Sequence, residues 1–213
     1  MNHLKFLYCI LLSLLFSSCS SSLENLSIHK AQVQFYYESG AYKKELTEVL
    51  SDAANEFSDI RPEAKSAVIF DVDETALSNY EAIKAMGFGY MSEFWHKWVL
   101  EGRAPAIEEV KDFYKTLISR GFRIIFLTGR SQKEYDATYK NLIGAGYTKF
   151  DTLIVRSPSV KDAPAYNFKS IERLVLTQLG YKIVGCVGDQ DSDIEGDHTG
   201  IKVRLPNYMY SVE

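Results

Sequence analysis

The apolar residues of this chain fall into short continuous runs, separated by longer segments in which they recur every three or four positions. The continuous runs are residues 67–70, 124–127, 153–155 and 183–187. Strands that are buried on both faces of a sheet show this continuous pattern. A fifth run, residues 201–205, alternates apolar and charged side chains and predicts a strand with one face in water.

The segments between these runs predict amphipathic helices. The longest segment, residues 28–57, is divided at Gly40, so we expect two helices there. Ser131 and Glu134 have the spacing of a capping box and predict the start of a later helix. The apolar residues expected to face inward are Ile107, Val110, Tyr114, Leu117 and Ile118 in one helix, Tyr135, Tyr139, Leu142 and Ile143 in the next, and Ile171, Leu174, Val175 and Leu179 in the last. Alternating strands and helices predict an α/β fold, with a Rossmann-like parallel sheet, helices on both of its faces and an N-terminal helical segment.

The N-terminus has the pattern of an export signal. A polar start with one lysine precedes an apolar stretch, residues 6–16, and small residues then lead to Cys19. This stretch is shorter than the roughly 20 residues that a membrane-spanning helix needs, so a secretory signal peptide is expected. The segment resembles a bacterial lipoprotein box, which implies a signal peptide over 1–18, a lipid on Cys19 and a tether over 19–27. The alternative is cleavage near Ser18 that leaves an unmodified thiol. We expect an exported protein, anchored by its lipid to a bacterial membrane.

Composition narrows the class of protein further. Of the 213 residues, 46% are hydrophobic and 24% are charged, with 13 Gly and 5 Pro. These values exclude a disordered chain and a collagen-like chain. The net charge of −4 argues against a nucleic-acid partner, which a basic surface would bind. The length fits one domain over residues 28–213, large enough to bury its own core.

Polar clusters follow three of the predicted strands. Asp71 and Asp73 come directly after the first run, Thr128 and Gly129 after the second, and Asp189 after the fourth. Parallel sheets of this kind bind ligands at the carboxyl ends of their strands, so we expect these residues to meet at one rim. Carboxylates that meet without a cation oppose each other's ionisation. A hard divalent cation with oxygen ligands removes that cost, which predicts a Mg²⁺ site that uses Asp71 and Asp189.

The same residue types suit phosphoryl transfer. A carboxylate at the metal, such as Asp71, can attack an electrophile and form a covalent intermediate. The carboxyl group of Asp73 can protonate the leaving group and then deprotonate water. The Thr128 hydroxyl, the backbone N–H groups near Gly129 and a lysine would hold the tetrahedral anion. Together these groups form the set that phosphoryl transfer requires.

Three strings of the sequence carry a family resemblance. They are Asp71-Val-Asp73-Glu-Thr75, Thr128-Gly-Arg130 and Gly188-Asp189-x-x-x-Asp193. Their order and their places after strands resemble the signature of the haloacid dehalogenase superfamily. Residues 68–79 and 188–194 further resemble its acid phosphatase subfamily, which includes bacterial class C lipoprotein phosphatases and plant vegetative storage proteins. The likeness extends from about residue 35 to residue 210.

The resemblance implies roles at the catalytic and metal positions. Asp71 would be the nucleophile and a metal ligand. Asp73 would be the acid–base residue and would give its backbone carbonyl to the metal. Asp189 would complete the metal ligands, and Asp193 would support them from outside.

The resemblance also implies a phosphate-binding set. Thr128 and Gly129 would bind the substrate phosphate together with a lysine. Lys169 matches the family's lysine best, and Lys161 is the alternative. Arg130 either binds the substrate phosphate or forms a local salt bridge.

Members of the superfamily insert a cap over the site at the position of residues 76–105, so the resemblance implies a small helical cap there. The segment is rich in aromatic residues, which could stack on a nucleotide base or an aryl leaving group. For Phe94 and Trp98, four positions apart, we favour a simpler role, the packing of a short helix onto the domain. The roles of Tyr80, Tyr90 and His96 stay open.

We therefore expect an exported, Mg²⁺-dependent acid phosphatase that hydrolyses small phosphate monoesters through an aspartyl-phosphate. One alternative is a phosphotransferase of the same chemistry, in which an alcohol replaces water. The other is a non-catalytic surface or storage protein that retains the fold.

Overall fold

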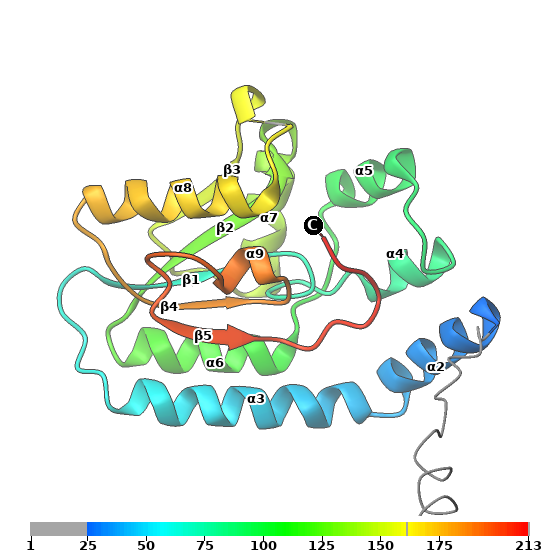
Figure 1. Cartoon of the computed structure of the whole chain (residues 1–213), viewed down its shortest axis with the longest axis horizontal. Helices are drawn as coiled ribbons and strands as arrows, with labels where there is room; N and C mark the ends of the chain where they lie inside the picture. The colour runs from blue at the N-terminus through cyan, green and yellow to red at the C-terminus, as the bar shows by residue number, and fades with distance from the viewer. Residues whose placement is uncertain (1–24, 161, 213) are drawn as a thin grey trace, which may run out of the picture.

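A computed structural model describes residues 25–160 and 162–212 of the chain, and a parallel sheet forms its centre (Figure 1). The strands are β1 (Ser66–Phe70), β2 (Arg123–Ser131), β3 (Thr152–Arg156), β4 (Lys182–Gly188) and β5 (Ile201–Arg204). Their order is β3-β2-β1-β4-β5, and each neighbouring pair is parallel. The predicted strands are confirmed. Because β1 lies between β2 and β4, the carboxyl ends of these three strands are adjacent.

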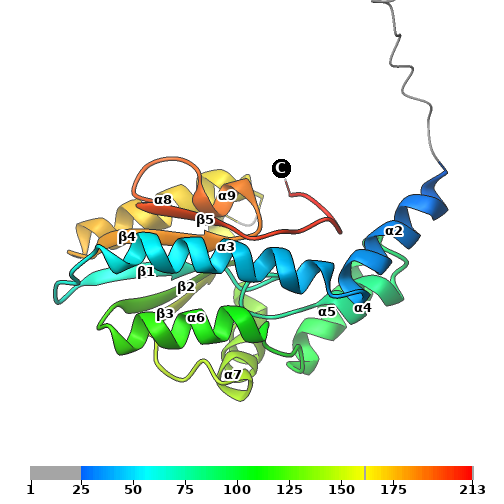
Figure 2. The ribbon, with the colours of Figure 1, turned by 90° about the horizontal axis from the view of Figure 1, so that it is seen from below.

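Helices cover both faces of the sheet. One face packs against α3 (Ala41–Ser58), α6 (Glu108–Ser119) and α7 (Tyr135–Ala145), and Phe57, Phe113 and Leu142 lie in that core. The other face packs against α8 (Ala165–Gln178) and α9 (Asp191–Ile194), through Phe168 and Ile194. Figures 1 and 2 show the sheet between these two layers. The Rossmann-like architecture expected from the sequence is confirmed.

An N-terminal pair of helices precedes the sheet. α2 (Leu26–Glu38) and α3 meet at Gly40, whose φ of 90° is a backbone conformation that favours glycine. The side chain of Asn25 accepts a hydrogen bond from the Ser27 N–H at 2.8 Å, and this cap starts α2 inside the segment predicted as a tether. The last two residues of that segment, 26 and 27, are therefore helical.

The predicted signal peptide and Cys19 lie outside the residues that the structure describes. Within residues 25–160 and 162–212, no helix combines the length and the apolar character that crossing a bilayer requires.

The segment between β1 and α6 forms two short helices, α4 (Tyr80–Ala85) and α5 (Ser92–Glu101). Both lie beside the carboxyl-terminal edge of the sheet (Figure 1). Two 3-10 turns, η1 (Gln132–Glu134) and η2 (Pro158–Val160), complete the described elements. The capping box of Ser131 and Glu134 is confirmed, although it opens η1, which then leads into α7.

The inward face of α8 differs from the prediction. Ile171, Leu174, Val175 and Leu179 were expected inside, but they are 55%, 43%, 39% and 60% exposed. The buried side chains of the helix are Ala165, Phe168, Lys169, Arg173 and Leu176. The helix turns two cations inward because the protein offers them partners there. Arg173 donates to backbone carbonyls of Ser192, Asp193, Glu195 and Asp197, and Lys169 meets two carboxylates.

The inward face of α7 is also partly polar. Tyr139 and Ile143, which were expected inside, are partly exposed, whereas Thr138 and Asn141 are buried. The Asn141 amide bonds both the N–H and the carbonyl of Ala104. Buried polar groups need such partners, so hydrogen bonding rather than apolar spacing decides which side of α7 faces inward.

Candidate active site

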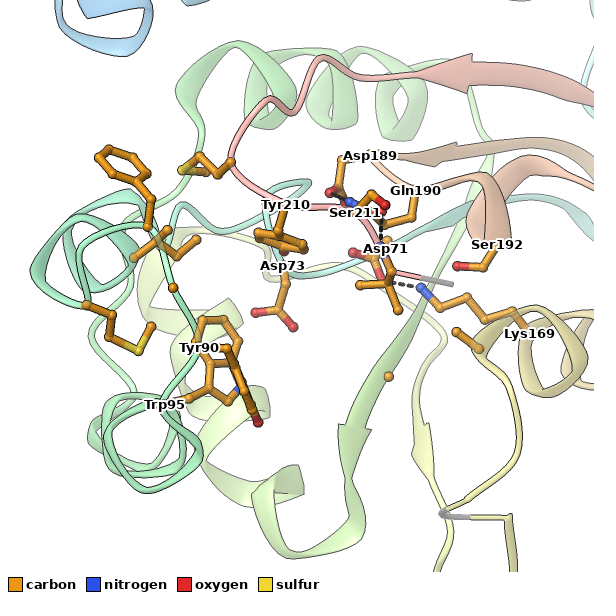
Figure 3. A pocket seen from close by; sticks show the side chains of 18 of the residues that line it. Asp71, Asp73, Tyr90, Trp95, Lys169, Asp189, Gln190, Ser192, Tyr210 and Ser211 are labelled. Carbon is orange, nitrogen blue, oxygen red and sulfur yellow. Dashed lines mark hydrogen bonds and ion pairs between the residues drawn. The ribbon is translucent and has the colours of Figure 1, made fainter. Parts of the chain in front are cut away.

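The residues predicted from three distant segments come together at one rim of the sheet. Asp71 follows β1, and its N–H donates to the carbonyl of Val187 in β4 at 2.9 Å, so the nucleophile candidate is held by the sheet itself. Carboxylate oxygens of Asp71, Asp189 and Asp193 lie within 4.8 Å of one another. Figure 3 shows Asp71 and Asp189 side by side at the end of the sheet, with Lys169 reaching them from α8.

Lys169 bridges two of these carboxylates. Its Nζ lies 2.6 Å from Asp71 Oδ1 and also donates to Asp193 Oδ1. Burial alone would lower the pKa of Lys169, but the charges of Asp193 and Asp71 outweigh it and raise the pKa above its usual value. Lys169 therefore stays charged between its partners. The structure places this lysine at the site, whereas Lys161 lies outside the described residues.

Asp193 is fixed by the turn in which it lies. Its Oδ2 accepts the Gln190 N–H at 2.8 Å, in a capping box that starts α9. A Cβ on Gly188 would lie 2.2 Å from Asp193 Cβ, so a side chain at position 188 would displace this carboxylate. The glycine of the predicted third string thus makes room for the aspartate that follows it.

Asp189 is bound by neutral groups. The Asn207 and Gln190 amides donate to its Oδ2 at 2.7 and 2.5 Å, and the Thr75 hydroxyl donates to Oδ1 at 3.3 Å. Burial, with the charge of Asp193, raises the pKa of Asp189 to about 6. Burial likewise raises the pKa of Asp71 well above its usual range, and the attraction of Lys169 does not cancel it.

The donor set fits a divalent cation. Lys169 supplies one positive charge to Asp71 and Asp193, while the groups bound to Asp189 bring no charge. Buried carboxylates with raised pKa values gain from a cation that shares their oxygens, and hard oxygen ligands are those that Mg²⁺ prefers.

Asp73 projects into the cavity beside Asp71 (Figure 3). Arg130 donates to it from Nε at 3.1 Å and from Nη2 at 2.7 Å, and the Asn79 amide donates at 2.9 Å. Arg130 is itself held by the Thr138 hydroxyl at 3.1 Å. Of the two roles considered for Arg130, the structure therefore shows the local salt bridge, which orients the acid–base candidate.

The phosphate-binding candidates Thr128 and Gly129 were expected to follow the second strand, but β2 extends to Ser131 and contains both. Gly129 lines the cavity. The Thr128 side chain is fully buried, and its hydroxyl accepts the N–H of Arg130 at 3.2 Å. Thr128 thus supports the backbone at Gly129 in the last part of β2, where the pairing with β3 is irregular between Leu127 and Ser131.

A cavity of about 490 Å³ opens over these groups. Ile83, Met86, Phe88, Tyr90 and Trp95 line it from the α4–α5 segment, and Met209, Tyr210, Ser211 and Val212 line it from the C-terminal segment. Charged groups therefore form the floor, and largely apolar side chains form the walls. Such a cavity is typical of a small-molecule site.

A model of the haloacid dehalogenase superfamily, subfamily IIIB (acid phosphatase), matches residues 18–213. The chain belongs to this subfamily. Acid phosphatase 1 of Solanum lycopersicum is 35% identical over 187 residues, which cover 84% of this chain and 73% of that protein. The class C acid phosphatase of Bacillus anthracis has the same fold, with a TM-score of 0.70 at 23% identity over 87% of each chain.

The stem 28 kDa glycoprotein of Glycine max is 38% identical over 161 residues, or 73% of this chain. That match covers 63% of the glycoprotein, so the chain spans less than two thirds of this relative. The family expected from the three strings is confirmed.

In this chain of subfamily IIIB, the aromatic residues of the predicted cap segment lie only partly where they were expected. Trp98 packs against the core and donates to Asn79 Oδ1 at 2.8 Å, but Phe94 is 40% exposed, so the packing role predicted for it is wrong. Tyr90 lines the cavity, and His96 Nδ1 lies 2.9 Å from Glu134 Oε1. This contact joins α5 to η1, the turn after β2.

Sequence reasoning missed a second group of residues around the site. Glu74 is buried and accepts the Tyr210 hydroxyl and the Asn79 N–H, both at 2.6 Å. Burial, with the charges of Asp73 and Asp189, raises the pKa of Glu74 to about 8. These bonds join the C-terminal segment to the first string of the family signature. The position of Glu74 between Asp73 and Thr75 was the one signal in the sequence that could have drawn attention to it.

Proposed function

We propose that the chain is an exported, Mg²⁺-dependent phosphomonoesterase that works through an aspartyl-phosphate. The observation that carries the proposal is the approach of the Asp71 and Asp189 carboxylates to within 4.8 Å at the floor of a cavity. Membership of an acid phosphatase subfamily supports it.

Asp71 and Asp189 would hold the Mg²⁺, with the backbone carbonyl of Asp73 as the family resemblance implies. The ion would neutralise charge on the phosphate and on the two carboxylates. Lys169, 2.6 Å from Asp71, is placed to bind a phosphate oxygen beside the nucleophile. The backbone at Gly129 lines the same cavity, and its N–H groups can donate to another oxygen of the phosphate.

The first step breaks the ester bond. A carboxylate oxygen of Asp71 attacks the phosphorus, the bond from phosphorus to the leaving oxygen breaks, and Asp73 gives that oxygen its proton. Arg130, bound to both oxygens of Asp73, keeps the carboxyl group directed at the cavity.

The second step returns the enzyme to its first state. Asp73 takes a proton from a water molecule, whose oxygen attacks the phosphorus of the aspartyl-phosphate. The bond from phosphorus to Asp71 breaks, which releases inorganic phosphate and restores the carboxylate. An alcohol in place of this water would make the protein a phosphotransferase.

A storage protein without activity is the second candidate, because the family resemblance extends to plant vegetative storage proteins. Against it stand the nucleophile candidate, its lysine and both carboxylates, which are present and close together. Such a set brings buried charges together at a cost in stability that storage alone does not explain.

Removal of the metal should abolish hydrolysis. We expect the chain to hydrolyse an aryl phosphate with Mg²⁺ and to lose more than about 99% of that rate in excess chelator, because the floor carboxylates then repel the phosphate. Release of inorganic phosphate measures the rate, and restored activity on adding Mg²⁺ is the control. Full activity in chelator would contradict the metal, and no activity in any condition would favour the storage protein.

We further propose that a lipid on Cys19 anchors the exported chain to a bacterial membrane, as the segment before it resembles a lipoprotein signal. Cys19→Ser should then move the protein from the membrane fraction to the soluble fraction and remove labelling by radioactive palmitate. Cys9→Ser, a cysteine change inside the predicted signal peptide, is the matched control and should stay in membranes. Retention of Cys19→Ser in the membrane fraction would rule out this anchor.

A further inference from the structure

Helix α2 makes its ring contacts with the rest of the protein through its last turn. None of its residues, 26–38, is buried, and Phe35 is 72% exposed. The contacts centre on a group of rings that we call the tyrosine cluster. Its members are Tyr36 and Tyr37 of α2, Tyr42 of α3, Tyr80 of α4 and Tyr208 of the C-terminal segment.

Tyr37 lies at the centre of this cluster. Its ring stacks on Tyr42 at 4.7 Å and on Tyr80 at 5.1 Å between centroids. Its hydroxyl accepts the N–H of Tyr208 at 3.4 Å. One side chain thus touches α3, α4 and the C-terminal segment, three parts of the chain that are far apart in sequence.

Two carboxylates strengthen the same junction. Glu38 accepts the Tyr80 hydroxyl at 2.9 Å and pairs with Lys84, so the end of α2 is tied to α4. Glu45 accepts the Tyr36 hydroxyl at 2.7 Å and the Tyr208 hydroxyl at 3.1 Å. The cluster therefore holds α4 on one side and the C-terminal segment on the other, as the closeness of α2 to α4 in Figures 1 and 2 also shows.

Both of the parts held by the cluster line the active-site cavity. Tyr80 begins α4, and Ile83, one turn later, lines the cavity. Tyr208 directly precedes Met209 and Tyr210, which line it as well. In Figure 3 Tyr210 stands over Asp73, while the cap side chains face it across the cavity.

The floor of the site is held differently. Asp71 and Lys169 depend on β1, β4 and α8, and Asp189 keeps bonds from Thr75 and Gln190 that do not involve the cluster. One further bond to Asp189, from the Asn207 amide at 2.7 Å, comes from the residue before Tyr208. A change in the tyrosine cluster should therefore move the walls of the cavity more than its floor.

We propose that Tyr37 is a positioning residue that holds α4 and the C-terminal segment in the places where they form the leaving-group walls of the cavity. The inference rests on the proposed phosphatase activity. Tyr37 touches no substrate; it acts through Tyr80 and Tyr208 on the residues that follow them.

The test compares Tyr37→Ala with Phe35→Ala, a matched aromatic truncation on the exposed face of the same helix. Steady-state kinetics with 1-naphthyl phosphate give kcat and KM, and competition with inorganic phosphate gives its inhibition constant. We expect Tyr37→Ala to raise KM about tenfold, because the variant loses two ring contacts. The values of kcat and of the phosphate inhibition constant should change less than about twofold. Phe35→Ala should match the unaltered chain.

The outcomes separate this inference from the proposed function. An unaltered chain that hydrolyses no phosphate ester overturns both. Normal hydrolysis with the same KM in Tyr37→Ala overturns the inference alone, and so does an equal weakening of naphthyl phosphate and inorganic phosphate, because the floor would then depend on Tyr37. If Tyr37→Ala does not fold, Tyr37→Leu keeps apolar volume without the ring stacking and should raise the same KM about threefold; an unchanged KM in that variant overturns the inference.

Discussion

Asp71→Asn should leave the protein folded and lower kcat for an aryl phosphate by at least about 10⁴-fold, the scale seen when a covalent nucleophile is removed. The amide has nearly the same shape but carries no negative charge, and its carbonyl oxygen is too weak a nucleophile to attack phosphorus. The fold should survive because burial already disfavours the charge of Asp71, and because Lys169 keeps Asp193 as a partner. Phosphate release and thermal unfolding measure the two properties.

The matched control for this variant is Asp191→Asn. Asp191 lies two residues after Asp189, but its side chain is 83% exposed and pairs with Arg204 on the surface. The control should keep its activity within about twofold, as surface substitutions usually do. Retention of more than about 1% of kcat by Asp71→Asn would contradict the aspartyl-phosphate mechanism, since the carboxylate would then not be the nucleophile.

The strands and the central residues of the site could both be predicted from sequence, because short local patterns mark them. Strands buried on both faces give continuous apolar runs, and these runs match β1 to β4. Asp71 and Asp189 follow their strands directly and Thr128 lies near the end of β2, so the topology of the sheet places all three once the strands are known. A short local pattern was enough in each case.

Other parts of the site leave no local pattern. The bond of Tyr210 to Glu74 joins residues 136 positions apart, and that of Asn207 to Asp189 joins residues 18 apart. The C-terminal wall therefore could not be found by spacing. The inward face of α8 was misjudged for a related reason, because Lys169 and Arg173 are buried against partners that lie in other elements.

The apolar pattern of α8 predicts one buried face and the active site requires another. Lys169 is the residue at which the two differ most. An apolar stripe on α8 is left in solvent while a lysine is buried between two carboxylates. The energetic cost of burying three charges is offset only if each keeps its partner. The stability of the α8 side of the sheet and the binding of phosphate are thus linked through one side chain.

Lys169→Met should accordingly damage both properties. We expect a loss of about 3–5 kcal/mol in the free energy of unfolding, the usual cost of leaving a buried charge without its partner. We also expect kcat/KM for an aryl phosphate to fall about 10³-fold, because the cation next to the nucleophile is lost. Urea unfolding followed by circular dichroism gives the first quantity, and phosphate release gives the second.

The double variant Lys169→Met with Asp193→Asn separates the two effects. In Lys169→Met both Asp71 and Asp193 lose their cation, and Asp193→Asn removes one of these two unpaired charges. Part of the lost stability should therefore return. The value of kcat/KM should stay low, because no cation is restored. Activity within about tenfold of the unaltered chain in Lys169→Met would show that Lys169 does not bind the phosphate. The family lysine would then be Lys161, and Lys161→Met in the same assay should show the loss instead.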